Sequence, residues 1–580
     1  MSDQRKSELA SAEECDRRVL QLYEQLLEIE QRLIPTGLHI FGRVGDSQRQ
    51  ADTLRMVASF DRPELGARSL LDLIAQGLSG SDYNSIIKAG EREVRLLDEI
   101  NKLLSHSIEL LIAQGVGIAS DFLFIEAKVD RQKSLPMFQL LKGLSEQLKT
   151  NQELDSLMRA LSGEYIPAGP GADIVQNPHI LPTGRNTHAI NPYHVPSVSA
   201  FTRGESVANS LLERYLNEHG RYPRAIALVL WGLDNIKTQG EGVAQALWLL
   251  GVRPVRDSLN RATGVEPIPL AVLNRPRIDV VMTVSGIFRD LFSPTMQLLD
   301  KAVRLVAGLD EPVEMNYLRR HVTEQMSKEK SSFDEAVVRV FSNAPGNYGT
   351  NVNFMVMDSQ WDQERTLGDL FVTRKCFAYG RDSCGESIDG TEARESMDRA
   401  LTRVEATYQN IDTFEIGITD VDHYFEYLGG ISKAVETRAQ AKPSIYLSDA
   451  LSREARVRTL EETVRLETRA KTLNPKWFEG MLNHGFRGVA EIENHVANTF
   501  GWSATADAVD DWIYDEVAST FLIDDVMLDR LRSLNPHSTH SLVGRLLEAH
   551  GRGYWEADES TLGKLRQIGN SLEDQLEGVV

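Results

Sequence analysis

Two parts of the sequence place polar side chains directly after an apolar run, which is how α/β proteins arrange polar groups around a ligand crevice. The run Ala225–Leu230 is followed by Trp231-Gly-Leu-Asp-Asn-Ile-Lys-Thr238, and the run Ile278–Val284 is followed by Ser285-Gly-Ile-Phe-Arg-Asp290. If the two runs are neighbouring strands, their polar ends lie side by side. A protein core has no need of such clusters, so we expect a ligand there.

Three other segments carry residue types suited to binding or proton transfer. Leu181-Pro-Thr-Gly-Arg-Asn-Thr-His188 lies in a stretch rich in proline and glycine. The loop Arg339–Asn351 is rich in glycine and asparagine, so its backbone N–H groups could face an anion or a carboxylate. Carboxylates and an imidazole lie close together in Asn410-Ile-Asp412 and Thr419-Asp-Val-Asp-His-Tyr424. Each segment is a candidate site.

Each candidate also has a purely structural interpretation. The loop Arg339–Asn351 could be a tight connection between elements. Asp420–His423 could be a helix N-cap and its neighbours, because aspartate and threonine favour that position. Arg289 and Asp290 could simply pair with each other. No single segment therefore identifies a reaction.

Several common motifs are absent from the sequence. It has no HExxH and no EF-hand loop, and Cys15, Cys376 and Cys384 do not have the spacing of zinc ligands. Three cysteines without a CxxC pair suit a reducing compartment, so we expect a cytoplasmic protein. No GxxxxGK[ST] phosphate loop occurs, so any ATP used in its chemistry must be hydrolysed elsewhere.

The composition is that of a globular protein with several cores. The chain has 580 residues, of which 42% are hydrophobic and 25% charged, and this length favours two to four domains. Its net charge of -21 disfavours a surface that tracks nucleic acid. No apolar run approaches the roughly 18 residues of a membrane-spanning helix, and the first residues lack the apolar core of a signal peptide.

The pattern along the chain predicts an α/β protein with helical regions on either side. Residues 1–162 and 451–580 have mainly helical periodicity, and residues 163–450 alternate strands with helices, which predicts a parallel sheet. The stretch 163–196 is too dense in proline and glycine for regular elements, and we expect a long, ordered loop.

Individual elements follow from the same periodicity. Helices are predicted at residues 8–33, 69–78, 86–105, 140–161, 205–218 and 241–250, and strands at 225–230, 278–284 and 444–447.

The ordered set of segments resembles the C-terminal half of the large H subunit of magnesium chelatase, in the family shared with the cobaltochelatase large subunits. The matching segments lie in one order along the chain: Arg32–His39, Leu181–Asn186, Trp231–Thr238, Gly251–Pro254, Arg275–Val280, Ser285–Asp290, Asn474–Trp477 and Gly551–Trp555. Details such as Asp234-Asn-Ile-Lys237, Glu311–Asn316 and Gly501–Thr505 favour the magnesium branch over the cobalt branch.

The resemblance implies a porphyrin-binding component of magnesium chelatase, which helps insert Mg2+ into protoporphyrin IX. Mg2+ and the porphyrin are its substrates, and ATP is hydrolysed by separate I and D subunits of the AAA+ class. The family's large subunits are considerably longer, so we expect that a separate chain could supply a missing N-terminal half. A shortened paralogue and an incomplete gene are the other interpretations.

The candidate residues combine the strand-end pattern with this resemblance. A flat macrocycle requires an apolar, aromatic-lined cleft with cationic anchors for its carboxylates, and removal of its N–H protons requires bases. The candidate catalytic residues are His188, Asp234, Asp422 and His423. The candidate binding residues are Arg185, Asn186, Trp231, Lys237, Arg289, Asn343 and Tyr348. The sequence identifies no site for the metal ion.

Two other functions fit the same sequence. A non-catalytic tetrapyrrole carrier or regulator would bind porphyrin without metal insertion. A cobaltochelatase-type large subunit would act on a puckered corrin instead of a flat porphyrin.

Overall fold

The computed structural model describes residues 38–62, 65–88, 94–171, 174–175, 177–188, 190–363, 365–411, 413, 416–449 and 456–579. The chain forms two compact units, Met1–His188 and Ala189–Val580. The predicted helix at residues 8–33, together with Cys15 and Asp412, lies outside the described residues. The three-region division expected from the sequence stays a prediction.

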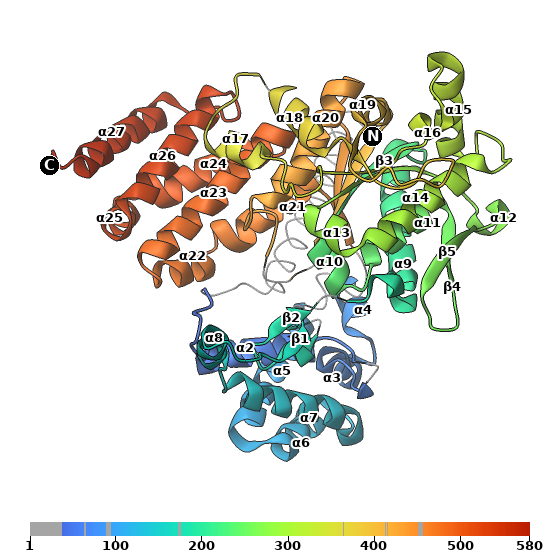
Figure 1. Cartoon of the computed structure of the whole chain (residues 1–580). Helices are drawn as coiled ribbons and strands as arrows, with labels where there is room; N and C mark the ends of the chain where they lie inside the picture. Colours follow the sequence, from blue (N-terminus) through green and yellow to red (C-terminus); the bar gives the residue numbers. More distant parts are fainter. Residues whose placement is uncertain are drawn as a thin grey trace, which may run out of the picture. The chain divides into compact units, whose positions relative to one another are not determined.

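The first unit is mainly helical among its described residues (Figure 1). Its helices are α2 (Ser47–Ala58), α3 (Leu70–Ser79), α4 (Tyr83–Lys88), α5 (Val94–Gln114), α6 (Val116–Ala127), α7 (Arg131–Leu148) and α8 (Glu153–Leu161). Leucine, isoleucine, phenylalanine and alanine side chains of α2, α3, α5, α6 and α7 form one apolar core.

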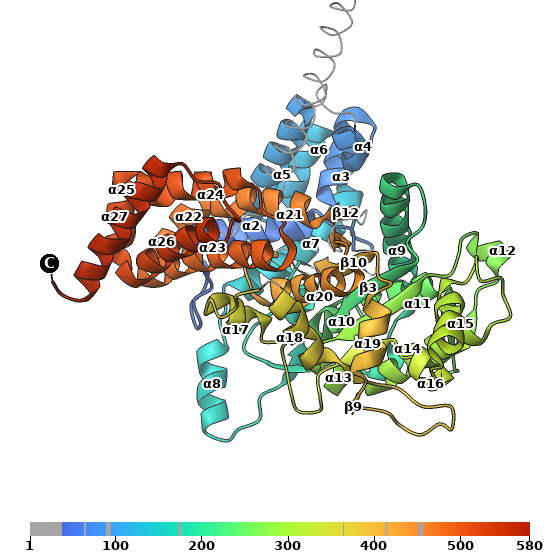
Figure 2. The same ribbon diagram turned by 90° about the horizontal axis from the view of Figure 1, so that it is seen from above.

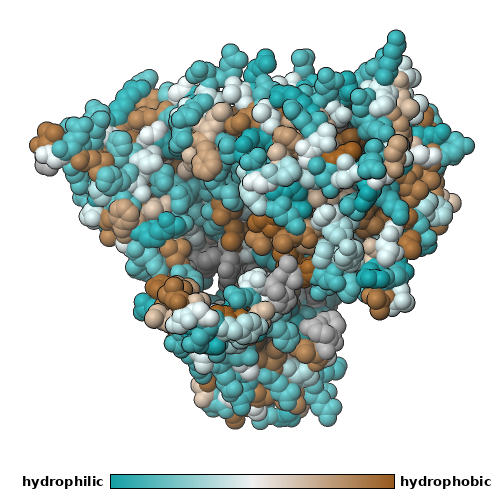
Figure 3. Space-filling view, viewed as in Figure 1, coloured by the Kyte–Doolittle hydropathy of each residue, from teal (hydrophilic) through white to brown (hydrophobic). Residues whose placement is uncertain are grey.

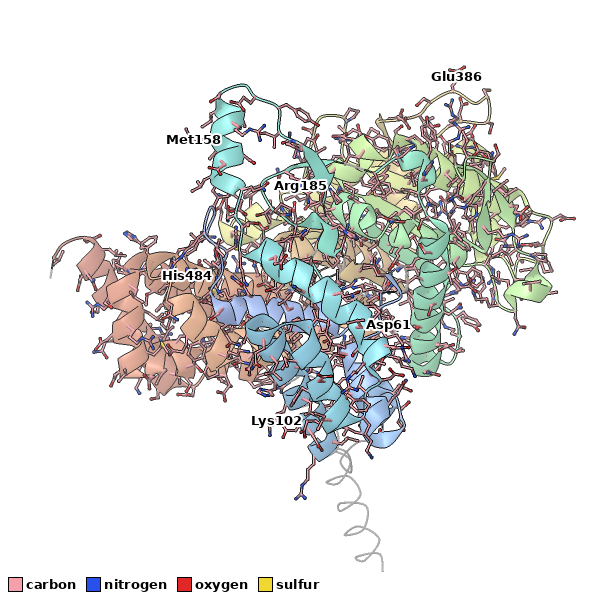
Figure 4. The ribbon with its side chains drawn as sticks, turned by 90° about the horizontal axis from the view of Figure 1, so that it is seen from below. Asp61, Lys102, Met158, Arg185, Glu386 and His484 are labelled. Atoms are coloured by element: carbon pink, nitrogen blue, oxygen red, sulfur yellow. The ribbon has the colours of Figure 1, made fainter. Side chains whose placement is uncertain are left out.

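The helix predicted at residues 140–161 is wrong as a single element. The α7 helix ends at Leu148, and α8 begins at Glu153. Asn151 Oδ1 accepts the N–H of Glu153 at 2.8 Å, and this local bond competes with continued helix formation. The new helix exposes apolar side chains, including Met158 at 62% (Figures 3 and 4).

The loop predicted at residues 163–196 contains short regular elements, which corrects the sequence-based expectation. Strands β1 (Ala168–Pro170) and β2 (Asn186–His188) pair in parallel, and single 3₁₀ turns occur at η3 (Pro178–Ile180) and η4 (Pro192–His194). Prolines begin both 3₁₀ turns, where a missing N–H is tolerated.

The second unit is built around a mixed eight-stranded sheet, so the α/β class is confirmed. Its order is β12-β11-β10-β3-β6-β7-β8-β9. The five central strands are parallel, namely β11 (Ser444–Asp449), β10 (Ala406–Ile411), β3 (Ala225–Leu230), β6 (Asp279–Val284) and β7 (Val340–Ser342). The predicted parallel sheet is formed by these five strands, and antiparallel pairings extend it by β12 (Arg456–Thr459) on one side and by β8 (Phe377–Ala378) and β9 (Thr391–Glu392) on the other.

The strand order contains a reversal point between β3 and β10. From β3 the chain continues outward to β6 and β7, and it then returns to the other side of β3 to form β10 and β11. In open α/β sheets, ligands bind beyond the carboxyl ends of the strands at such a point. The segments that follow β3, β6, β7 and β10 are therefore the candidate ligand-binding segments.

Helices cover both faces of this sheet (Figures 1 and 2). Helices α9 (Val198–His219), α11 (Glu241–Leu250) and α14 (Ser293–Gly308) share one apolar core with Ile226 and Leu228 of β3. On the opposite face, α20 (Gly430–Ala439) contacts β10 through a 2.7 Å hydrogen bond between the hydroxyls of Ser432 and Thr407, and it packs against α18 (Arg365–Lys375).

The other elements of the second unit extend this core. Within the α/β part they are α10 (Gly232–Lys237), β4 (Val252–Arg256), β5 (Ala262–Pro267), α12 (Leu270–Leu273), α13 (Gly286–Leu291), α15 (Tyr317–Glu329), α16 (Phe333–Ala336), α17 (Val352–Met357), α19 (Arg394–Leu401) and the π-helical η5 (Phe425–Gly429).

A layer of helices follows β12. It contains α21 (Leu460–Glu467), η6 (Thr468–Thr472), α22 (Pro475–Leu482), α23 (Phe486–Ala506), α24 (Asp511–Ala518), η7 (Ser519–Ile523), α25 (Asp525–Leu534), α26 (Pro536–Gly551) and α27 (Glu559–Leu576). Among the described residues, no helix is long and apolar enough to cross a membrane.

Candidate functional site

The predicted site residues are distributed over both units. Arg185, Asn186 and His188 lie in the first unit, and Trp231, Asp234, Lys237, Arg289, Asn343, Tyr348, Asp422 and His423 lie in the second. Within the second unit they follow four strands, β3, β6, β7 and β10, whose carboxyl ends meet at one edge of the sheet.

The residues in the first unit hold their own segment together. The Arg185 guanidinium donates to the carbonyls of His179 and Pro182 at 3.1 Å and to that of Leu181 (Figure 4). Asn186 Nδ2 donates to the carbonyl of Ile166 at 3.2 Å. These bonds order the loop, and a ligand-binding role for its side chains stays a prediction.

The ends of β3 and β6 lie side by side, as the sequence predicts. The strands pair in register from Ala225 with Asp279 to Leu230 with Val284. Beyond them, the N–H of Gly232 donates to Ser285 Oγ at 3.1 Å. A Cβ atom on Gly232 would lie only 2.8 Å from the nitrogen of Phe288, so glycine permits this close approach of the two turns.

Arg289 is paired inside the protein. Its Nε lies 2.7 Å from Asp290 Oδ1, and its Nη1 donates to the carbonyls of Ala344 at 2.8 Å and Asn347 at 2.9 Å. The Tyr348 hydroxyl donates to the second oxygen of Asp290. The Arg289 guanidinium also lowers the pKa of Asp290. Arg289 therefore pairs with Asp290, as its structural interpretation predicts, and it also holds the loop after β7. The role of an anchor stays a prediction.

Lys375 is a central residue of this edge that the sequence did not single out. It is fully buried at the end of α18, and its Nζ donates to the carbonyl of Val284 at 2.9 Å and to Asn343 Oδ1 at 2.8 Å. Its Nζ also lies 4.2 Å from the centre of the Tyr427 ring. Burial lowers the pKa of Lys375 well below its usual value. The site thus contains a buried amino group joined to three of its segments.

The glycine- and asparagine-rich loop does face a carboxylate, and that carboxylate belongs to Glu426. Glu426 is 1% exposed, and its Oε1 accepts the N–H of Asn351 at 3.0 Å, the Thr350 hydroxyl at 3.1 Å and the N–H of Thr350. Glu426 lies in the π-helical turn η5 after β10. The segments after β7 and β10 are therefore tied together through one side chain.

His423 is the exposed member of this network. Its Nδ1 lies 2.9 Å from Glu426 Oε2, and its side chain is 61% exposed. The hydrogen bond to Glu426 raises the pKa of His423. Burial alone would raise the pKa of Glu426, but His423 and the Thr350 N–H outweigh burial and lower it. An accessible imidazole held by a buried carboxylate is suited to accepting and releasing protons near neutral pH.

Aromatic side chains lie next to this pair. The Trp231 ring centre is 4.4 Å from that of Tyr427 and 6.3 Å from that of His423. Asp422 accepts a 2.6 Å hydrogen bond from Asn353 Nδ2. The predicted residues Trp231, Asp422 and His423 thus lie in neighbouring segments, together with Tyr427, which the sequence analysis missed.

Asp234 and Lys237 lie on α10, and Asp234 is only 4% exposed. The negative charges of Asp234 and Glu241 contribute, after burial, to the raised pKa of Tyr408 in β10. Burial raises the pKa of Glu241 itself to about 7. Asp234 therefore belongs to a buried polar group next to β10, and a catalytic role for it stays a prediction.

No group of three or more histidine, cysteine, aspartate or glutamate side chains that could hold a metal ion occurs among the residues described by the structure. Of the cysteines in this part of the chain, Cys376 is buried and Cys384 is exposed, and both are free thiols.

Comparison with known proteins gives a consistent result. Residues 2–562 match the family described as CobN/Magnesium Chelatase. A protein of Oryza sativa subsp. indica named magnesium-chelatase subunit ChlH, chloroplastic, is 42% identical over 98% of this chain and 43% of its own length. A protein of Chlorobaculum parvum, named as the H subunit of magnesium chelatase, is 37% identical over 99% of this chain and 47% of its own length.

A solved structure agrees with the fold over the same extent. The catalytic subunit of cobaltochelatase from Mycobacterium tuberculosis superposes with a TM-score of 0.88 at 33% identity, over 96% of this chain and 47% of that one. The chain therefore spans about half the length of the relatives it matches.

Proposed function

The chain belongs to the CobN/magnesium chelatase family, and from this we propose that it is a porphyrin-binding component of a magnesium chelatase. In this role it helps to insert Mg2+ into protoporphyrin IX, and both are substrates. The two relatives named as magnesium-chelatase subunits are more similar in sequence than the cobaltochelatase structure, which supports the magnesium branch.

One feature of the site carries this proposal: an aromatic pair and an acid–base pair lie at the same edge of the sheet. Trp231 is half-buried beside the buried ring of Tyr427 and offers apolar ring surface suited to a flat macrocycle. His423, held by Glu426, offers an accessible group to receive pyrrole protons. Metal insertion needs a base, because two N–H protons must leave the porphyrin. It also needs the macrocycle to be held in place while Mg2+ loses its tightly bound water ligands.

The energy source and the partners belong to the same proposal. The sequence has no GxxxxGK[ST] phosphate loop, so we assign ATP hydrolysis to separate I and D subunits. We also propose that the part of the family's large subunit that lies outside the matched half takes part in the reaction. The cytoplasmic location expected from the sequence stays a prediction, and the name of the rice relative contains the word chloroplastic.

Porphyrin binding is tested by the quenching of tryptophan fluorescence with deuteroporphyrin. We expect saturable quenching of the wild-type chain and about tenfold weaker binding by Trp231→Ala, because stacking on an aromatic ring contributes about 1 kcal/mol or more. Trp512→Ala is the matched control, because this ring lies on α24 in the C-terminal helical layer. Absence of quenching, with the complementary part of the family's large subunit also present, would contradict the proposal.

A non-catalytic carrier is the second candidate, because the half-buried ring of Trp231 suits binding of a macrocycle whether or not a metal ion is inserted. It predicts porphyrin binding without magnesium insertion when all other subunits and ATP are supplied. A cobaltochelatase-type function is separated by competition, since a corrin would then displace deuteroporphyrin.

A further inference from the structure

A segment after β10 is held by polar side chains of the helical layer that follows the sheet. Asp420 Oδ1 lies 2.8 Å from His495 Nε2, and Asp420 Oδ2 binds Lys471 Nζ. Oδ2 also accepts the N–H of Gly417 at 2.5 Å. Lys471 comes from η6 and His495 from α23, and their side chains are 5% and 2% exposed. One carboxylate is thus clamped between two helical elements.

Further side chains of the helical layer hold the residues just before Asp420. Glu467 accepts both the N–H and the hydroxyl of Thr419 at 3.0 Å. Asn498 Nδ2 donates to the carbonyl of Thr419 at 2.8 Å, and Trp502 Nε1 donates to the carbonyl of Ile418 at 2.9 Å. His495, Asn498 and Trp502 are spaced as neighbours on one face of α23. This face of the helix therefore binds the segment 417–420.

The fit between the segment and the helical layer is close. A Cβ atom on Gly417 would lie 2.0 Å from Glu467 Oε1, so only glycine allows the backbone to approach this carboxylate. Glu467 is 1% exposed and is itself held by Thr419. A larger residue at position 417 must displace either the segment or the glutamate.

Two basic side chains hold the carboxylate of Asp420 inside the protein. Burial alone would raise the pKa of Asp420, but Lys471 and His495 outweigh it and lower the pKa well below its usual range. A buried carboxylate remains charged only with such close partners. The two oxygens of Asp420 are thus bound to Lys471 and His495, and they are not available to bind a ligand.

The same segment continues directly into the candidate site. Three residues after Asp420 the chain reaches His423, and Glu426 and Tyr427 follow within the π-helical turn η5. Glu426 binds the loop after β7, and Tyr427 lies against Trp231 and Lys375. Residues 417–427 therefore bridge the helical layer and the sheet edge, with bonds at both ends.

We propose that Asp420 is a positioning residue: clamped between Lys471 and His495, it sets the place of His423, Glu426 and Tyr427 against Trp231. Through these bonds the helices α21–α23 influence the geometry of the site, although their side chains do not contact its ligand. The effect on porphyrin binding rests on the proposed function, whereas the effect on the position of Trp231 does not.

The position of Trp231 is measured by fluorine NMR of the full chain labelled with 5-fluorotryptophan, and the Trp231 signal is assigned with Trp231→Phe. We expect Lys471→Met and Thr419→Val to move the Trp231 signal. The first variant removes a partner of Asp420, and the second removes the hydrogen bond from the Thr419 hydroxyl to Glu467. Thr419→Ser keeps the hydroxyl and should restore the wild-type position.

Arg465→Met is the matched control. It breaks an ion pair with Asp510 at 2.8 Å, six residues before Lys471, and it does not touch the segment 417–420. Because Trp512 Nε1 also donates to Asp510, this variant should move the Trp512 signal and leave that of Trp231 in place. An internal positive control is thus present in the same spectrum.

An unmoved Trp231 signal in a folded Lys471→Met variant overturns the proposal, as does an equal movement in Arg465→Met. If Lys471→Met fails to fold, the test uses Thr419→Val and Asn498→Ala, each of which removes the bonds of a single side chain. An unmoved Trp231 signal in these folded variants then overturns the proposal.

Deuteroporphyrin binding by the same variants separates the two proposals. We expect Lys471→Met to bind about tenfold more weakly than the wild-type chain, since displaced site residues lose much of their contribution. A moved Trp231 signal with no porphyrin binding by the wild-type chain contradicts the proposed function and leaves the positioning role supported.

Discussion

At the amino-terminal edge of the central sheet, Asp279 lies 2.7 and 3.0 Å from two nitrogens of Arg339 and 2.8 Å from His321 Nδ1, and all three side chains are buried. At the carboxyl-terminal edge, the buried Glu426 instead holds a histidine that is 61% exposed, next to the aromatic ring of Trp231. Both edges use carboxylates with basic partners, but only one presents a member to solvent.

The difference separates charge used for stability from charge available for chemistry. Burial alone would raise the pKa of Asp279, and Arg339 with His321 lowers it well below its usual range, so Asp279 stays ionised inside a network that is closed to solvent. The pair His423 and Glu426 can change its protonation state near neutral pH, because the imidazole reaches water. Parallel sheets place ligands at this second edge, and the contrast between the edges is therefore testable.

The largest expected effect on stability is at the amino-terminal edge of the sheet, where the charged side chains are closed to solvent. Arg339→Met leaves Asp279 buried with only His321, and we expect it to reduce the free energy of unfolding by about 3–5 kcal/mol. Denaturant unfolding measures this loss, and porphyrin affinity of the folded variant should stay unchanged. Arg253→Met, which breaks an exposed pair with Glu266, is the control and should change stability by less than about 1 kcal/mol. A weakened porphyrin affinity in Arg339→Met would remove the distinction between the edges.

A smaller effect is expected for Lys375→Met at the open edge. It leaves the carbonyl of Val284 and Asn343 Oδ1 without their donor, which should cost about 2 kcal/mol at pH 9. Burial lowers the pKa of Lys375 in the folded chain well below 10.5, its ordinary value in the unfolded chain. At pH values between the folded-state pKa and 10.5, the unfolded chain therefore binds more protons than the folded one. Wild-type stability therefore rises with pH across this window, and that of the variant does not.

Unfolding curves at pH 7 and pH 9 measure this difference for Lys375→Met. The loss of stability relative to the wild type should be smaller at pH 7 than at pH 9. Lys442→Met, at a partly exposed lysine, should show the same stability difference at both pH values. A loss that is independent of pH would mean that Lys375 is not perturbed by burial.

The smallest effect is expected for His423→Gln. The raised pKa of His423 makes its stabilisation complete below about pH 6.5 and lost as the pH rises through the raised value. The lowered pKa of Glu426 makes its stabilisation complete above about pH 4.5 and lost as the pH falls through the lowered value. The wild type should therefore exceed the variant by less than about 1 kcal/mol, mainly between these limits.

Thermal or denaturant unfolding as a function of pH provides the check for His423→Gln. Its partner variant Glu426→Gln should reduce stability more, because it also weakens the bonds to Thr350 and Asn351. A stability difference for His423→Gln that grows above pH 8 would have the wrong sign for a histidine paired with a carboxylate.

The fold was predictable where an element carries its own pattern. The strand Ala225–Leu230 and the helix Glu241–Leu250 were located to the residue, because a continuous apolar run and a largely apolar segment bounded by glycines need no tertiary information. Strand β10 was missed because Thr407 and Gln409 interrupt its apolar run, and β7 was missed because it has only three residues.

The same division applies to the site. Trp231 and Arg289 follow recognisable strands, so their place at the sheet edge could be inferred from position alone. Lys375, Glu426 and Tyr427 lie on helical segments that carry no strand-end signal, and nothing local distinguishes them from ordinary helix residues. The sequence left open whether the loop after β7 faces an anion, faces a carboxylate or is a tight connection, and only the fold places the carboxylate of Glu426 against it.

The sequence by itself therefore determined the family, the α/β class and the strand ends that carry polar residues, because these depend on residue order and local periodicity. Only the tertiary structure decided which charges are closed off and which remain available. Burial and partner geometry determine the pKa values of Asp279, Lys375 and His423, and both arise when segments far apart in the chain pack together.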